Sequence, residues 1–327
     1  MPGHVIDLRR RSRARALGLV PILVAAGCGA GASPAPPSIA AVTASPGSVE
    51  TSAGSSTSAP PASPASLAAF RVAPGDILFN HSDPSEVYAI SADGTNRRHL
   101  TDLPGDWTAA LSPDGTRIAW SRDRGNGRDI YIMQADGSDV RRLTGNDFSS
   151  YHPSWSPDGT RLVFAGLEVG ELFEIDADGS NEVKLSGENE RFPEWSPDGK
   201  QIVFVRGPEG ARDVYVANAD GSGAQRLTAD PEDNVITVWS PDGRLIAFDR
   251  SSAGKTDIWV MHTDGTSQVQ LTKDGTSAWP AFSPDGRSIA FAHGTTTTGT
   301  DIWVMNADGT SPRPLTTTGL DWGPNWR

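Results

Sequence analysis

The chain has 327 residues, a formal net charge of -12 and a single cysteine, which excludes an intramolecular disulfide. The acidic balance argues against a partner with a phosphate backbone, so we expect no nucleic-acid binding. Abundant glycine (35) and proline (25) favour turns over long helices, and all ten tryptophans lie between Trp107 and Trp326, where we expect the folded part of the chain.

The first 27 residues have the pattern of a secretory signal peptide. Five arginines lie between Arg9 and Arg15, and an apolar run too short to span a bilayer follows from Ala16 to Ala26. The next residues, Ala25-Ala26-Gly27-Cys28, resemble a bacterial lipobox with alanine where leucine is usual. We therefore expect cleavage before Cys28 and lipidation of its thiol. An ordinary signal peptide with a chance cysteine is the alternative.

Residues 28–70 are predicted to be a lipidated cysteine followed by a disordered linker. Gly29 to Phe70 consist mostly of Ala, Ser, Pro, Gly and Thr, and their only charged residue is Glu50. Such a segment has no apolar face to bury, so its ordering entropy is not offset. Since no later apolar run is long enough for a membrane span, we expect membrane contact through the lipid anchor alone. The expected location is secreted, anchored to the outer leaflet of the cell membrane or in the periplasm.

Residues 71–327 repeat themselves with a period of 40–44 residues. Ser-Pro-Asp-Gly begins at Ser112, Ser156, Ser196, Ser240 and Ser283. An Asp-Gly pair begins at Asp93, Asp136, Asp178, Asp220, Asp264 and Asp308, and Leu-Thr or Leu-Ser closes each unit. A period of this length with several short strands is typical of propeller blades.

Each unit is predicted to contain four strands. The first is short and usually ends in Trp or Phe, as at Trp155, and Ser-Pro-Asp-Gly then turns the chain. The second strand alternates apolar residues, as at Ile118 and Trp120, and the third begins with an acid, as at Asp129. The Asp-Gly pair makes the second hairpin, and the fourth strand ends at Leu-Thr.

The first unit, Asp76 to Thr101, lacks a first strand, whereas Gly323 to Trp326 resembles a first strand without the other three. We therefore expect the C-terminal strand to complete the first blade, with Trp326 hydrogen-bonded beside Ile77–Phe79. The predicted fold is all-β: a six-bladed β-propeller closed by its C-terminal strand.

The motifs Pro-x-Trp-Ser-Pro-Asp-Gly, Ile-Ala-Phe, Asp-Ile-Trp-Val-Met, Ala-Asp-Gly-Thr and Leu-Thr resemble the TolB-type propeller repeat, which is similar to WD repeats. The resemblance covers roughly residues 76–327 and implies a propeller. Known members include the periplasmic TolB protein and the propellers of prolyl-oligopeptidase-like enzymes. TolB has an N-terminal α/β domain where this chain has the linker, so the resemblance implies a fold more firmly than a Tol-Pal role.

Catalytic signatures are missing from the sequence, which has no Gly-x-Ser-x-Gly, His-Glu-x-x-His or Cys-x-x-Cys. We therefore expect a binding module rather than an enzyme, and no cofactor. Asp176-Ala177-Asp178-Gly179 resembles part of a calcium loop, but its Asp-Gly belongs to the repeated hairpin. The acid that opens every third strand is expected to bond groups of its own blade, because a scaffold needs the same contact in every blade.

The loops between strands two and three and between strands four and one vary, and strand order places them on one face. We expect this variable face to bind a protein, peptide or glycan. Candidate ligand-binding residues around its mouth are Trp107, Tyr151, His152, Glu190, Arg191, Asp230, Glu232, Asp233, Trp279 and Trp322. Acids suit positive charge and aromatic faces suit sugars and cations. The alternatives are a solvated acidic rim, a polysaccharide lyase or hydrolase using His152, Glu190 and Arg191, and a structural scaffold of the cell envelope.

Overall fold

The computed structural model describes residues 72–101, 103–295 and 299–327. The predicted signal peptide, Cys28, the predicted linker and Asp102 lie outside this part of the chain. The described residues form β-strands and turns, and none of them belongs to a helix able to cross a membrane.

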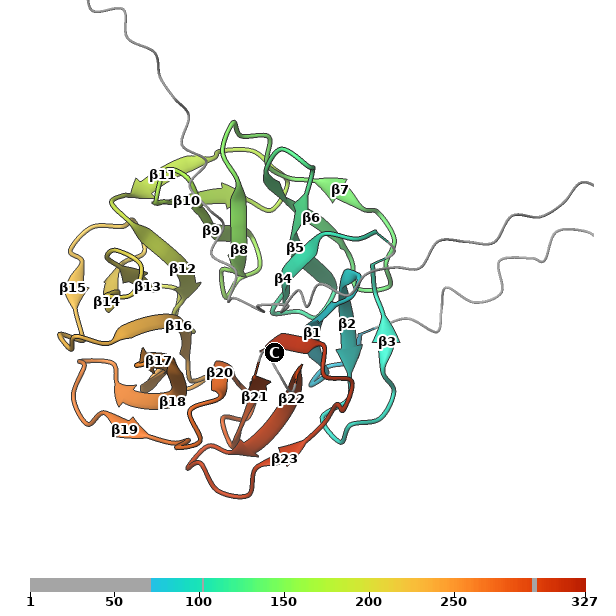
Figure 1. Cartoon of the computed structure of the whole chain (residues 1–327). Helices are drawn as coiled ribbons and strands as arrows, with labels where there is room; N and C mark the ends of the chain where they lie inside the picture. The colour runs from blue at the N-terminus through green and yellow to red at the C-terminus, as the bar shows by residue number, and fades with distance from the viewer. Residues whose placement is uncertain (1–71, 102, 296–298) are drawn as a thin grey trace, which may run out of the picture. The chain divides into compact units, whose positions relative to one another are not determined.

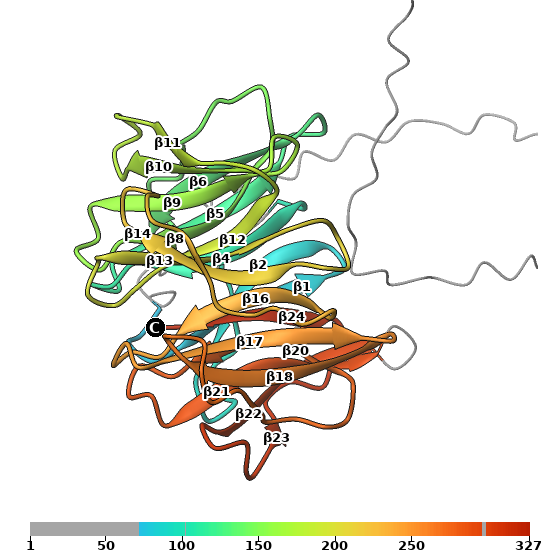
Figure 2. The same ribbon diagram turned by 90° about the vertical axis from the view of Figure 1, so that its left-hand side faces the viewer.

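Six antiparallel sheets of four strands surround a central axis (Figure 1). Blade 1 consists of β24, β1, β2 and β3, and blades 2 to 6 follow in chain order as β4–β7, β8–β11, β12–β15, β16–β19 and β20–β23. Figure 2 shows the sheets from the side. The prediction of a six-bladed propeller is confirmed.

The innermost strand of each blade borders the central channel. These inner strands are β24 (Asp321–Trp326), β4 (Asp106–Leu111), β8 (Ser150–Trp155), β12 (Glu190–Trp195), β16 (Asp233–Trp239) and β20 (Ser277–Phe282). The second strands are β1 (Ile77–Ser82), β5 (Arg117–Asp123), β9 (Arg161–Gly166), β13 (Gln201–Arg206), β17 (Leu245–Ser252) and β21 (Ser288–Thr295).

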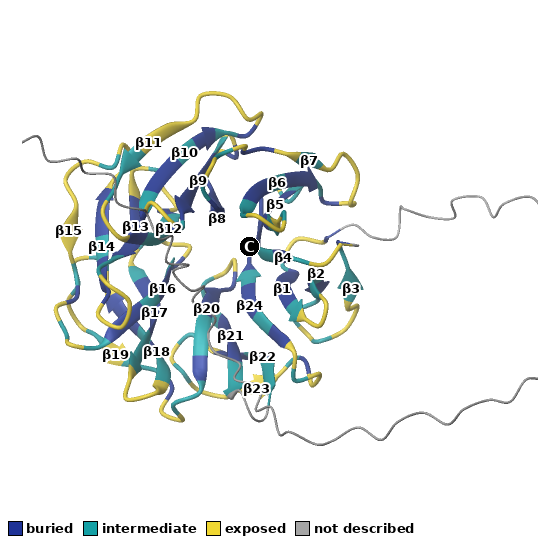
Figure 3. Cartoon of the chain, turned by 45° about the horizontal axis from the view of Figure 1, so that its top comes forward, coloured by how far each residue is buried: buried dark blue, intermediate teal, exposed yellow. Residues whose placement is uncertain are grey.

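The third strands are β2 (Ser85–Ile90), β6 (Arg128–Gln134), β10 (Glu171–Asp176), β14 (Asp213–Asn218), β18 (Lys255–His262) and β22 (Gly299–Asn306). The outermost strands are β3 (Arg98–His99), β7 (Arg141–Arg142), β11 (Val183–Ser186), β15 (Gln225–Arg226), β19 (Val269–Gln270) and β23 (Arg313–Pro314). Five of these outer strands stop before the Leu-Thr pair that we expected to end them. Figure 3 shows outer strands such as β15 as exposed.

The ring closes between β24 and β1, as predicted. These strands pair antiparallel, with Ile77 opposite Trp326 and Leu78 opposite Asn325. The Trp326 indole N–H donates to the Gly75 carbonyl at 2.9 Å. Closure pairs β1 on both sides, so β1 has no unpaired edge.

Each Ser-Pro-Asp-Gly turn is held by its own side chains, as in blade 3. The Ser156 hydroxyl donates to Asp158 Oδ1 at 2.6 Å and accepts the Arg161 N–H at 2.9 Å. Gly159 takes the left-handed conformation, with φ of 69°. The Ser156 hydroxyl and the Thr160 N–H bond the Asp158 carboxylate and lower its pKa to about 2. These bonds fix the geometry of the turn and so the direction in which strand two begins.

The acid that opens a third strand bonds within its own blade, as expected. In blade 2 the Thr144 hydroxyl donates to Asp129 Oδ1 at 3.3 Å and accepts the Ile130 N–H at 3.0 Å. The same pair of bonds recurs in blades 4, 5 and 6. The apolar core lies between neighbouring blades and includes one fully buried aromatic from each second strand. These are Phe79, Trp120, Phe164, Phe204, Phe248 and Phe291.

Candidate functional site

The third residue of five inner strands has a left-handed backbone. The φ angles are 48° at Thr108, 56° at His152, 55° at Phe192, 57° at Trp279 and 61° at Gly323. The pairing of each inner strand with strand two shifts register around this position. β16 shows the same shift and is one residue longer than the other inner strands. A left-handed residue other than glycine is strained, so it persists only where neighbours hold it.

At three of these positions, Thr108, His152 and Trp279, a polar side chain of the preceding blade bonds the backbone N–H. Asn80 Oδ1 accepts the Thr108 N–H at 3.0 Å, and Ser121 Oγ accepts the His152 N–H at 3.2 Å. Asp249, which is 2% exposed, accepts the N–H groups of Ile236 at 2.9 Å and Trp279 at 3.1 Å. Burial raises the pKa of Asp249 to about 6. These bonds fix where the third side chain lies in the channel.

We call the cluster of Trp107, His152, Phe192, Trp279 and Trp322 the aromatic plug. The ring centroids of Trp107 and Trp322 are 5.2 Å apart, and those of Trp322 and Trp279 are 5.3 Å apart. His152 lies 5.1 Å from Phe192 and 6.0 Å from Trp279. The plug joins inner strands of five blades across the channel.

His152 is neutral near pH 7, because burial lowers its pKa to about 4. Its Nδ1 atom is buried without a hydrogen-bond partner among the residues that the structure describes. Within the plug His152 therefore acts as a flat apolar ring, like Phe192 and Trp279 at the matching positions of other blades.

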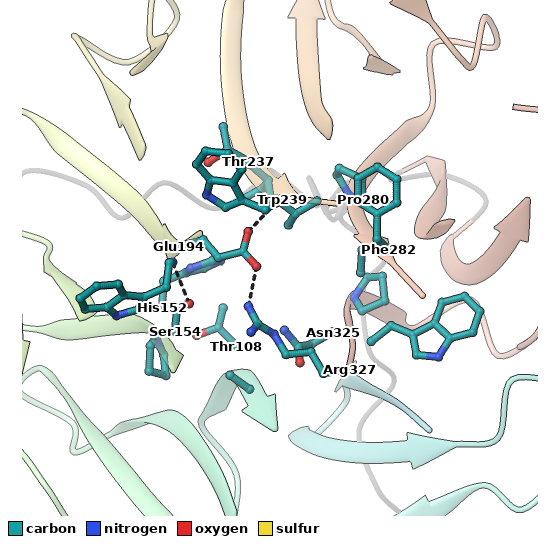
Figure 4. Close-up of a pocket in the computed structure, with 18 of the residues that line it drawn as sticks. Thr108, His152, Ser154, Glu194, Thr237, Trp239, Pro280, Phe282, Asn325 and Arg327 are labelled. Atoms are coloured by element: carbon teal, nitrogen blue, oxygen red, sulfur yellow. Dashed lines mark hydrogen bonds and ion pairs between the residues drawn. The ribbon is translucent and has the colours of Figure 1, made fainter. Parts of the chain in front are cut away.

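A cavity of about 300 Å³ occupies the channel beside the plug (Figure 4). Residues of all six inner strands line it, and His152 and Trp279 of the plug form one end. The prolines of the five Ser-Pro-Asp-Gly turns also line it: Pro113, Pro157, Pro197, Pro241 and Pro284. The cavity therefore opens on the face that carries these turns, opposite the variable loops.

One ion pair lies in this largely apolar wall. Glu194 accepts the Trp239 N–H at 2.9 Å and pairs with the Arg327 guanidinium at 2.6 Å (Figure 4). Burial raises the pKa of Glu194, while Arg327 and the Trp239 N–H act in the opposite direction. The Glu194 side chain is 13% exposed and that of Arg327 is 27% exposed, so both groups can be reached from the cavity.

Of the four acids expected at the mouth of the variable face, three pair with arginines. Glu190, which is fully buried, pairs with Arg206, and Asp230 pairs with Arg250. Asp233 Oδ1 accepts the Arg212 Nε–H at 2.8 Å. The same holds for Asp106, whose Oδ1 lies 2.6 Å from Arg122 Nε, and for Asp321, which pairs with Arg97 and His81. Most of these carboxylates therefore do not form an unpaired acidic rim.

The remaining candidates have separate surroundings. Arg191 donates to the Tyr151 hydroxyl at 3.2 Å and to the Leu167 carbonyl at 3.0 Å. Glu232 is partly exposed in the loop before β16. Within the described ranges, His152, Glu190 and Arg191 share no hydrogen bond or ion pair with one another. The catalytic grouping suggested by the sequence is therefore not assembled.

Sequence reasoning missed Glu194, Arg327 and Asp249, and it interpreted the turn prolines as turn formers only. The repeated Pro-Asp could have shown that five prolines meet around one axis. Nothing in the local sequence marks Glu194 or Asp249. Among the residues that the structure describes, no group of three or more His, Cys, Asp or Glu side chains is placed to hold a metal ion.

Solved structures share this fold. The crystal structure of TolB from Acinetobacter baumannii matches with a TM-score of 0.68 and 22% identity, covering 77% of this chain and 66% of that chain. A structure titled as oligogalacturonate lyase in complex with manganese matches with a TM-score of 0.53 and 18% identity, covering 70% of each chain. At these identities the likeness shows the fold alone.

Curated relatives match over short stretches. The Tol-Pal system protein TolB of Geobacter sulfurreducens is 33% identical over 72 residues, which is 22% of this chain and 17% of the relative. A TolB homologue of Chlorobium luteolum is 30% identical over 148 residues, covering 31% of this chain and 34% of the relative. The chain thus spans less than half the length of these relatives. The family model of the TolB beta propeller domain matches residues 49–191 and 172–327, so the chain belongs to the TolB β-propeller family.

Proposed function

We propose that this propeller is an extracytoplasmic binding module that takes a segment of a partner protein into its channel cavity. The observation that supports this most directly is the cavity itself, about 300 Å³ in volume and lined by all six blades. The membership of the periplasmic TolB protein in the family, and the relative named as a Tol-Pal system protein, support an envelope location.

The cavity wall suits a short segment with apolar side chains. Turn prolines, Trp195 and Trp239 supply apolar surface, and Glu194 with Arg327 offers both signs of charge. Ligand sites of this size are mostly apolar, with a few polar groups that fix orientation. The aromatic plug limits how deep a segment can enter. The partner therefore docks on the Ser-Pro-Asp-Gly face, and this differs from the variable-loop face favoured by the sequence alone.

The site is tested by filling the cavity. Val238 is partly exposed and lines the cavity, so Val238→Trp should lower the affinity of cavity ligands at least tenfold. Peptides selected by display against the full chain provide the ligands, and titration calorimetry gives their affinities. The matched control is Val269→Trp on the outer strand of the same blade, where the valine is 52% exposed. Peptides that bind both variants equally, or failure to enrich any peptide, would contradict the proposal.

We also propose that Cys28 carries a lipid that anchors the protein to a membrane, as the lipobox-like sequence suggests. Cys28→Ser removes the only thiol in the chain. The variant should appear in the soluble extracytoplasmic fraction, whereas the unmodified chain sediments with membranes. Fractionation followed by immunoblotting measures this. Equal sedimentation of both proteins would remove the anchor from the proposal.

A further inference from the structure

In blade 5 the side chain of Arg250 lies over the rings of Phe248 and Trp259, beside Asp230 in the loop that enters the inner strand. We call the space over these two rings, and the matching space in every other blade, the aromatic socket. Arg250 places its guanidinium carbon 4.6 Å from the Trp259 centroid and 5.2 Å from that of Phe248. The guanidinium also pairs with Asp230 and bonds Asn234 Oδ1 at 3.0 Å. A planar cation between rings and a carboxylate is a favourable arrangement.

The same socket is filled in blades 2 and 4 by the matching arginine. Arg122 lies 5.0 Å from the Tyr131 centroid and pairs with Asp106. Arg206 lies 4.6 Å from the Tyr215 centroid and pairs with Glu190.

Blades 1 and 3 lack that arginine, and another side chain takes its place. In blade 1 the position holds His81, and Arg97 brings its guanidinium to 4.5 Å from the Tyr88 centroid. In blade 3 the position holds Gly166, and the Phe148 ring stacks 4.8 Å from Phe173. A β-carbon on Gly166 would come within 2.6 Å of Val169 and 3.0 Å of the Phe148 ring, so these two side chains occupy that space.

Blade 6 differs from the other five. His293 stands at the arginine position, opposite Ser277, and Pro312 stands where blade 1 has Arg97. The imidazole lies 4.5 Å from the Trp303 centroid, and a cavity of about 190 Å³ remains beside it. Phe291, Trp303, Asp274, Lys273 and Pro312 line this cavity together with His293.

We propose that the aromatic socket of blade 6 binds the guanidinium group of an arginine side chain from a partner protein. The reason is a comparison among the blades: in blades 1, 2, 4 and 5 the matching socket holds a guanidinium that lies over aromatic rings and pairs with a carboxylate. Trp303 and Phe291 match Trp259 and Phe248 of blade 5, and Asp274 matches Asp230.

The carboxylate in this socket is available to a cation. Asp274 has a side chain that is 42% exposed, and among the described residues its nearest basic group is His293 Nδ1 at 3.8 Å. Asp274 Oδ1 accepts the N–H of Thr276 at 2.8 Å and its hydroxyl at 2.9 Å, and the Ser277 hydroxyl lies 3.0 Å from Oδ1 and 3.2 Å from Oδ2. These neutral donors fix the carboxylate at the cavity edge and, within the described part of the chain, leave its charge without an arginine or lysine partner. Arginine suits the site better than lysine, because its flat fork can stack on an indole and meet a carboxylate together. The exposed Lys273 at the rim opposes the bound cation, so Lys273→Gln should strengthen binding.

This site is independent of the proposed function. Asp274 lies in the loop between strands four and one, on the face opposite the Ser-Pro-Asp-Gly turns. Loss of binding at one site would therefore leave the other site intact, and Asp274→Asn at the blade 6 socket should not change peptide binding in the channel cavity.

The test is a titration of the full chain with three probes: N-acetyl-arginine methylamide, its lysine analogue and free L-arginine. Nuclear magnetic resonance of ¹⁵N-labelled protein follows the Trp303 indole signal. We expect saturable shifts with the blocked arginine at millimolar concentration. The lysine analogue should bind at least threefold more weakly than the blocked arginine, and free arginine should bind no more tightly than the blocked arginine. Asp274→Asn should weaken binding at least threefold. Asp264→Asn, in an exposed hairpin of blade 5, should leave it unchanged.

The decisive variant is His293→Arg, which restores the arrangement of blade 5. Its own guanidinium should fill the socket, abolish the shifts and raise the melting temperature by a few degrees. The proposal fails if the wild-type chain shows no saturable shift, or if His293→Arg binds the blocked arginine as well as the wild type does. Equal binding of the lysine analogue would reject guanidinium specificity, and tighter binding of free arginine would reject a polypeptide as the source.

Discussion

His152 shows how one residue can contribute both a strained backbone and an altered pKa. Its φ of 56° places the side chain in the channel, where it contacts Phe192 and Trp279. The sequence predicted that His152 lies near the channel, but not its conformation or its neutral state. Both depend on Ser121 of the preceding blade and on rings from other blades, which no local pattern reveals.

His152 makes stability depend on pH. Its folded-state pKa of about 4 lies below the ordinary value of 6.5, so below pH 6.5 the unfolded chain binds the proton more readily. The free energy of unfolding should therefore fall as the pH drops from 6.5 towards 4. Relative to His152→Phe, we expect the wild type to lose ~1–2 kcal/mol between pH 7 and pH 5. Urea unfolding of both proteins at the two pH values measures this. A difference that stays constant with pH would rule out the neutral histidine.

At the scale of the strand, the repeat predicted the number, order and hairpins of the blade strands. Alternation and turn residues are local, and the same pattern occurs in every unit, so errors in one unit are corrected by the others. The arginine pairs were missed because they join residues of different strands. Arg122 lies opposite Asp106 only once β4 and β5 are in register.

Removing one of these arginines should leave a buried charge. Asp106 has a fully buried side chain, and Arg122 is its ion-pair partner. Arg122→Met keeps most of the aliphatic packing but removes the cation, and we expect a loss of about 3 kcal/mol in the free energy of unfolding. Chemical denaturation measures this loss. Lys200→Met is the control, since its pair with Asp198 is 80% and 57% exposed, and should change stability by less than about 0.5 kcal/mol. Similar effects of both variants would show that the buried Arg122–Asp106 pair contributes no more to stability than an exposed pair.

At the scale of the molecule, the ring depends on the contact between β24 and β1. The sequence predicted this contact because the first unit lacked one strand and the last residues resembled one. It did not predict the cavity, since a cavity depends on how six inner strands with different side chains fill one axis. Glu194, Val238 and Asn325 occupy equivalent positions in three blades yet differ in size and charge.

Trp326 is the side chain that fastens the closing strand. It is 9% exposed, and its indole bonds the Gly75 carbonyl. Trp326→Ala should lower the free energy of unfolding by about 3–5 kcal/mol and promote association through the loosened edge of β1. Trp326→Phe should lose much less, because most of the apolar contact remains. Thermal unfolding and size-exclusion chromatography follow both effects. A monomeric Trp326→Ala variant with wild-type stability would show that closure does not depend on this residue.

The pairing of Ile77 with Trp326 has a kinetic consequence, since these residues are separated by most of the propeller sequence. Contacts this remote form slowly, because a long loop must close before any favourable interaction compensates for its entropy. Until then β1 is an unprotected template for strands of other molecules. Refolding yield should accordingly fall as protein concentration rises, even where the finished ring is stable.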